Sequence, residues 1–121
     1  VYDILVRLSR GRVKGKWVRV FQEGAKWIGA GKRINWRAKG MLFYLLGVVD
    51  YGNRIPGPSA VAHSLGVSRP GVSRAYQELR RAGIIVGERR HYRLSPLFCW
   101  KGGLRQLEEA IRELASEASV G

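Results

Sequence analysis

Polar and small side chains recur at helical spacing between residues 68 and 77, where they could contact a charged polymer. The set is Ser68, Arg69, Pro70, Ser73, Arg74 and Gln77. Guanidinium and carboxamide groups can form paired hydrogen bonds with phosphates and with base edges in a duplex. Apolar side chains alternate with them at Val72, Ala75 and Leu79 and would bury the other side. We predict a helix over about residues 69–82 whose outer face enters a DNA major groove, while Ser68 and the first-turn amides anchor a phosphate.

The residues before this helix fit a second helix and a sharp turn. Gly57 can cap and Pro58 can open a short helix that ends before Gly66, which can adopt a left-handed backbone. Ser68 would then cap the next helix with its hydroxyl. The segment 62–79 is typical of a helix-turn-helix. The alternative is an ordinary helical hairpin with a solvated polar face.

A β-hairpin is expected after Gly83, because the apolar residues 84–86 and the alternating residues 92–94 flank a polar segment and Pro96 closes it. Its tip would carry Arg89, Arg90 and His91. These residues are placed to reach phosphates or an adjacent minor groove, as the wing of a winged helix does. A solvated turn is the alternative.

The N-terminal segment is basic. Residues 4–8 and 17–21 predict strands of a hairpin or extended arm. The residues between them could lengthen a footprint on DNA through Arg10, Arg12, Lys14 and Lys16, or could serve only to solubilise the chain.

Two further helices would support the site. A short one is predicted over residues 22–28, and Asn35 can cap a longer one that runs to about Asp50. The inward stripe of the longer helix comprises Ala38, Met41, Leu42, Leu45 and Val49.

The C-terminal residues predict an amphipathic helix. Its apolar positions follow the alternating spacing of a coiled-coil strand, at Leu104, Leu107, Ile111 and Leu114. We expect this helix to form a homodimer, with folding back onto the core as the alternative. Gly102 and Gly103 mark a hinge, so the expected units are 1–102, a winged-helix domain with its basic arm, and 103–121, the dimerisation helix.

Charge separates the same two units. The chain carries a net charge of +13. Residues 1–102 hold 20 Lys and Arg against five Asp and Glu, whereas residues 103–121 hold two against four. Such a basic surface favours a polyanionic partner, and nucleic acid is the first candidate.

Other classes of function find little support. The single Cys99, the absence of a long apolar run and of a signal peptide predict a cytoplasmic protein without membrane contact. His63 and His91 have no neighbours at metal-ligand spacing, and the carboxylates are scattered. We therefore expect no enzyme activity, cofactor or metal. The tryptophans are spaced for packing rather than for base stacking, so RNA is a weaker option.

Several blocks of residues resemble the RepL-type plasmid replication proteins, a winged-helix family. The likeness covers about residues 17–102 and rests on Leu42–Leu46 with Val49–Arg54, on the helix-turn-helix, and on Tyr92–Pro96 leading to Trp100. It implies binding to a replication origin and recruitment of host replication proteins. Residues 68–77 would enter the groove and the hairpin would be the wing.

The expected fold class is therefore α+β and mostly α: a winged helix-turn-helix with an N-terminal β arm and a C-terminal amphipathic helix. The expected function is sequence-specific binding of double-stranded DNA at an inverted repeat by a dimer that initiates replication of a plasmid or mobile element. Two alternatives stay open: a regulator of transcription or copy number with the same fold, and an adaptor that recruits replication or transcription machinery.

Overall fold

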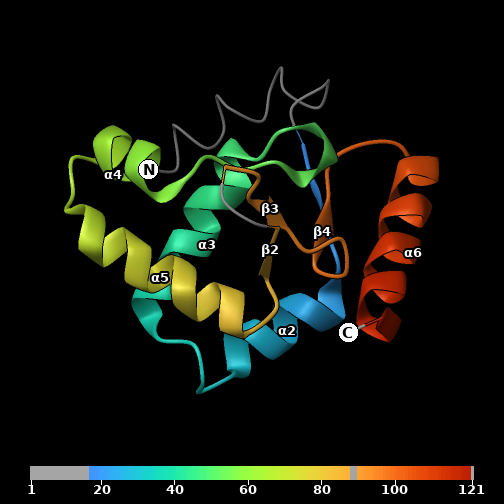
Figure 1. Ribbon diagram of the computed structural model, residues 1–121. Coiled ribbons are helices and arrows are strands. Elements are labelled where there is room, and N and C mark those ends of the chain that lie inside the picture. Colours follow the sequence, from blue (N-terminus) through green and yellow to red (C-terminus); the bar gives the residue numbers. More distant parts are fainter. Residues whose placement is uncertain (1–16, 88–89, 121) are drawn as a thin grey trace, which may run out of the picture.

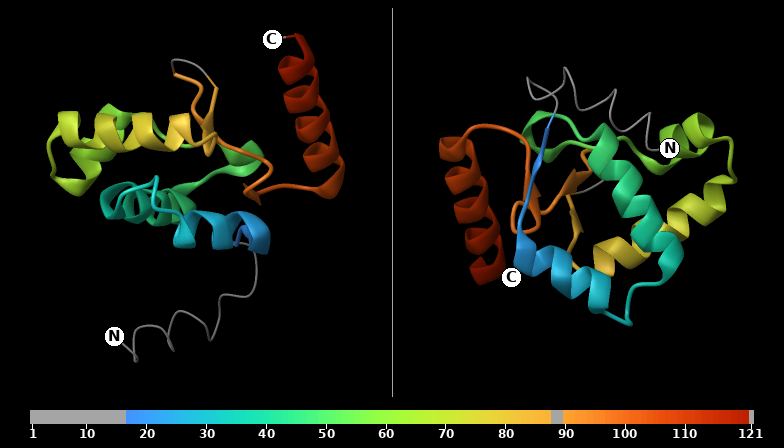
Figure 2. Two further views of the ribbon diagram at one scale, coloured as in Figure 1. Left: turned by 90° about the horizontal axis from the view of Figure 1, so that it is seen from below. Right: turned by 180° about the vertical axis from the view of Figure 1, so that it is seen from behind.

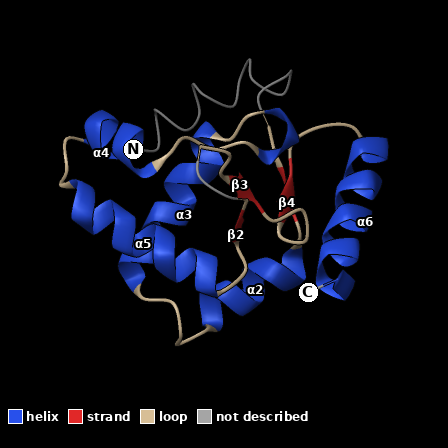
Figure 3. Ribbon diagram, viewed as in Figure 1, coloured by secondary structure: helices blue, strands red, loops and turns tan. Residues whose placement is uncertain are grey.

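The computed structural model describes residues 17–87 and 90–120 and has an α+β architecture that is mostly helical (Figures 1 and 3). The predicted fold class is confirmed at this level. The arm residues Arg10, Arg12, Lys14 and Lys16, and Arg89 at the predicted hairpin tip, lie outside the described residues.

Helices α2 (Gln22–Ala30) and α3 (Trp36–Val48) form one side of the molecule. Asn35 caps α3 as predicted, because its side chain accepts a hydrogen bond from the Ala38 amide at 2.9 Å. Helix α2 runs two residues beyond its predicted end. Lys39 Nζ donates to the carbonyls of Gly29 and Gly31 at 3.0 and 2.9 Å, which stabilises the C-terminal end of α2.

Helices α4 (Pro58–Leu65) and α5 (Arg69–Arg81) pack against each other, and α5 also packs on α3. Gly66 between them has φ 65° and ψ 34°, the left-handed conformation expected there. Ser68 occupies the N-cap position of α5, but its side chain makes no capping hydrogen bond. The predicted role of that hydroxyl as a cap is therefore wrong, although the helix begins where predicted.

Within residues 17–87 and 90–120, four strands form two short antiparallel ladders. Strands β2 (Ile85–Val86) and β3 (Arg93–Leu94) form the predicted hairpin, with Ile85 opposite Leu94. Strand β1 (Arg19–Val20) pairs with β4 (Cys99–Trp100), a pairing that the sequence did not predict. The second ladder joins the start of the described chain to the residues just before the last helix.

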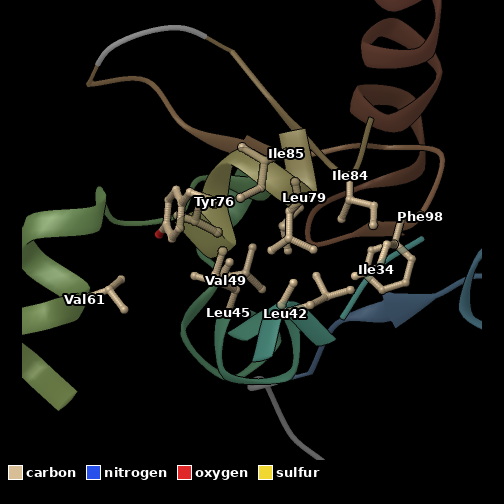
Figure 4. Packing of buried hydrophobic residues seen from close by; sticks show 14 of the residues in the cluster. Ile34, Leu42, Leu45, Val49, Val61, Tyr76, Leu79, Ile84, Ile85 and Phe98 are labelled. Atoms are coloured by element: carbon tan, nitrogen blue, oxygen red, sulfur yellow. The ribbon is translucent and has the colours of Figure 1, made fainter. Parts of the chain in front are cut away.

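The hydrophobic core lies between α3, α5 and the strands (Figure 4). Leu45 and Leu79 are completely buried at its centre, with Ile85 from β2 and Leu94 from β3 beside them. Of the predicted stripe on α3, Met41 is only partly buried, whereas the other four positions belong to the core. Burial of this apolar surface fixes α5 on α3 and therefore decides which face of α5 is exposed.

The short 3-10 helix η1 (Tyr51–Asn53) ends in a buried polar residue. Asn53 Nδ2 donates to the carbonyls of Leu94 and Cys99 at 2.9 and 2.7 Å, and its Oδ1 accepts from the Lys101 amide at 2.9 Å. Its φ of 64° is a left-handed conformation that asparagine tolerates better than most residues. Asn53 thus ties η1 to β3, β4 and the following loop.

Helix α6 (Leu104–Val120) stands at the edge of the molecule, beyond β4 and away from α5 (Figures 1 and 2). None of its described residues belongs to the hydrophobic core. Leu104 is 61% and Ile111 37% exposed, while Leu107 and Leu114 are half-buried. The alternative in which the apolar stripe folds into the core is therefore not what the structure has.

Candidate nucleic-acid interface

The outer face of α5 carries the residues predicted to contact DNA. Arg69, Pro70, Arg74 and Gln77 are exposed and Ser73 is half-buried, while Ser68 is exposed just before the helix. The opposite side of α5 is buried through Val72, Ala75, Tyr76 and Leu79. The structure thus brings the whole predicted set together on one surface.

Glu78, the one carboxylate of α5, is held away from this surface. Its two carboxylate oxygens accept hydrogen bonds from Asn35, at 2.8 Å from Nδ2 and 3.3 Å from the backbone amide. These bonds direct the negative charge toward the start of α3. The outer face of α5 is left with cationic and neutral polar groups, so it attracts phosphates rather than repelling them.

Arg80 links α5 to the hairpin. Its Nη2 donates to the Gly87 carbonyl at 2.5 Å, and its guanidinium lies 5.6 Å from the centre of the Tyr92 ring. Tyr76 packs edge-on against the same ring, with 5.5 Å between centroids. These contacts fix the hairpin beside the C-terminal half of α5. Sequence analysis missed Arg80, although its place one turn after Gln77 could have suggested it.

The hairpin adds further cations to the surface. Arg90 and His91 are exposed as predicted, and so is Arg93, which the prediction did not include. Arg90 has φ 66° and Gly87 has φ 90°, so the connection uses left-handed backbone on both sides of its tip. A Cβ on Gly87 would collide with the His91 carbonyl, so glycine is required there. The hairpin projects past α5 in Figure 2.

A groove of about 1030 Å³ separates the hairpin from α6. One wall carries the cations Arg54, Arg80 and Arg93, and the other carries the carboxylates Glu109 and Glu113. In the described part of the chain the only ion pair is Arg54 with Asp50, at 3.9 Å, so no pair spans the groove there. The negative wall would repel phosphates, so this groove is unfavourable for a polyanion.

Reactive groups do not gather near this surface. Burial raises the pKa of Cys99 to about 12, so its thiol stays protonated at neutral pH. Burial also raises the pKa of Tyr76, whose hydroxyl donates to the Pro56 carbonyl.

Within residues 17–87 and 90–120 no group of three or more His, Cys, Asp or Glu could hold a metal ion. No helix in these ranges has the length and apolar character that a membrane crossing requires.

The prediction that the tryptophans serve for packing is wrong for three of the four. Only Trp100 is buried, with its Nε1 donating to the Gly103 carbonyl at 2.9 Å. Trp17, Trp27 and Trp36 are all more than half exposed. Packing was expected because aromatic residues usually fill cores, but the aliphatic residues of α3 and α5 already fill this one.

Comparison with known proteins adds no relative. No protein-family model, curated protein or solved structure matches the chain. Membership of the RepL-type family therefore stays a prediction, and function must be inferred from the surface itself.

Proposed function

We propose that this protein binds double-stranded DNA sequence-specifically through a winged helix-turn-helix. The observation that carries this proposal is the outer face of α5, where Arg69, Arg74 and Gln77 are exposed while Glu78 is tied back to Asn35. In this proposal α5 is the recognition helix, α4 supports it, and the β2–β3 hairpin is the wing. The biological role that fits best is initiation of plasmid or mobile-element replication at an origin.

Different residues of this surface would make different kinds of contact with the duplex. Arg74 and Gln77 lie one turn apart on the exposed side, so both can reach base edges when α5 lies in a major groove. Arg69 and the first-turn amides at the N-terminus of α5 would contact a phosphate. Arg90 on the hairpin would contact the backbone or minor groove alongside.

Selection of bound fragments from random duplexes tests the proposal and supplies the cognate site. Arg74→Ala should then lower the affinity for that site by roughly 1–3 kcal/mol, with a smaller loss on random duplex, because a base contact is lost. Fluorescence anisotropy at fixed salt measures both values. Equal affinity of the unaltered protein for selected and random duplexes would instead favour a nonspecific adaptor.

We further propose that α6 forms a homodimer, which would place two recognition helices about 34 Å apart on an inverted repeat. Leu104→Lys combined with Ile111→Lys should convert the dimer to a monomer, because four lysines would meet across a two-fold interface. Both side chains are exposed, so the fold should persist.

Sedimentation equilibrium measures the mass. Leu97→Lys is the control, as Leu97 is 59% exposed outside α6. A monomeric unaltered protein would contradict the proposal.

A further inference from the structure

The side of α3 that faces away from the core carries two prominent aromatic rings. Trp36 is 82% and Phe43 79% exposed, the highest values among the exposed large hydrophobic residues. They share one helix face with Gly40 and Gly47, while Leu42 and Leu45 are buried on the opposite face. Since α5 packs on the buried side, this face is on the far side of α3 from the proposed duplex-binding surface (Figure 2).

Internal packing does not explain the two glycines. A Cβ at Gly40 or Gly47 would meet no heavy atom within 4 Å, so neither position is crowded by the rest of the chain. Glycine is the least favourable residue after proline in the middle of a helix. Its effect here is to leave bare backbone on both sides of Phe43, so that a flat group can approach the ring faces.

The segment that carries the rings is strongly basic, although the Glu78 carboxylate reaches the start of α3 at Asn35. Residues 24–49 contain five Lys and Arg and no Asp or Glu. Lys39 Nζ lies 4.7 Å from the centre of the Trp36 ring while it bonds to Gly29 and Gly31. Gly31 in turn lines a small hollow with Trp27, Lys32 and Arg33. These contacts link aromatic and cationic groups from the end of α2 to the first turns of α3.

We propose that this surface binds single-stranded DNA. Trp36 and Phe43 would stack on bases, and the neighbouring Lys and Arg side chains would contact the phosphates between them. Seven residues of helix separate the rings by about 10 Å along the axis. Both rings can thus engage different bases of one strand, with the bare surface at Gly40 between them.

Charge and shape favour a nucleic-acid strand over other occupants. A second copy placed symmetrically on this face would bring two basic segments close to each other, which opposes self-association. A lipid surface calls for a broad apolar face, because binding scales with the apolar area buried, whereas the glycines here leave only two separated rings. A single strand supplies both the flat groups that stack and the negative charge that the cations need.

The test uses the full chain and a fluorescein-labelled oligothymidylate of about 16 nucleotides, which cannot pair with itself. Trp36→Ala combined with Phe43→Ala should weaken its binding at least about tenfold in fluorescence anisotropy. Binding to duplex should change by less than about twofold, so this result is independent of the proposed duplex function. Phe43→Tyr should retain binding, because it keeps the ring.

Tyr51→Ala is the matched control, since Tyr51 is another exposed aromatic residue with a lysine, Lys101, over its ring. It should leave oligothymidylate binding unchanged. Unchanged binding by the Trp36 and Phe43 double variant would overturn the proposal. So would a double variant that loses self-association, or binding to phosphatidylglycerol vesicles, while it still binds the oligonucleotide as before.

Discussion

Replacing Asn53 with leucine should lower the free energy of unfolding by roughly 3–5 kcal/mol. The substitution removes the donor to the Leu94 and Cys99 carbonyls and the acceptor for the Lys101 amide, all at a site that is only 1% exposed. Leucine must also adopt the left-handed backbone, which costs about 1–2 kcal/mol. Urea denaturation followed by circular dichroism measures the change.

Asn53→Gly separates the two causes. Glycine adopts a φ of 64° without strain, so this variant should lose the hydrogen bonds but be less destabilised than the leucine variant by about 1 kcal/mol. A loss below about 1 kcal/mol in both variants would mean that water replaces the amide. In that case the buried asparagine would not be what holds η1, β3 and β4 together.

Reversing two charges on α5 should nearly abolish binding to duplex DNA. Arg69→Glu with Arg74→Glu removes two contacts worth roughly 1–3 kcal/mol each and adds repulsion of phosphates, so affinity should fall more than about 100-fold. The logarithmic dependence of affinity on salt should also become shallower, because fewer counterions are released. Anisotropy titrations over a range of salt concentrations measure both effects.

The control for this experiment carries the same change in net charge elsewhere. Arg105→Glu with Arg112→Glu also takes the chain from +13 to +9, but both residues are exposed on α6. This variant should lose much less affinity, since its altered charges lie outside the proposed interface. An equal loss in the two double variants would show that overall charge, and not the face of α5, governs binding.

Local signals explain what the sequence could predict. Asn35, Gly66 and the Gly57–Pro58 pair mark helix boundaries within a few residues of themselves, and the structure confirms these boundaries. The exposed face of α5 followed from the same periodicity, because burial of Val72 and Leu79 leaves Arg74 and Gln77 outside.

What the sequence could not predict depends on residues far apart in the chain. Strand β1 pairs with β4 across some 80 positions, and no local pattern encodes that partner. Asn53 has the residue type of an ordinary turn, and its partners at Leu94, Cys99 and Lys101 lie more than 40 positions further along the chain. Trp36 and Phe43 face outward only because Leu42 and Leu45 already occupy the space next to α5.

The pairing of β1 with β4 brings the start of the described chain next to the residues that precede α6. Arg19 lies opposite Trp100 in an antiparallel pair, so the chain enters the domain and departs toward α6 at the same corner. A pull on α6 would therefore act on this ladder of two short strands before it reached α5.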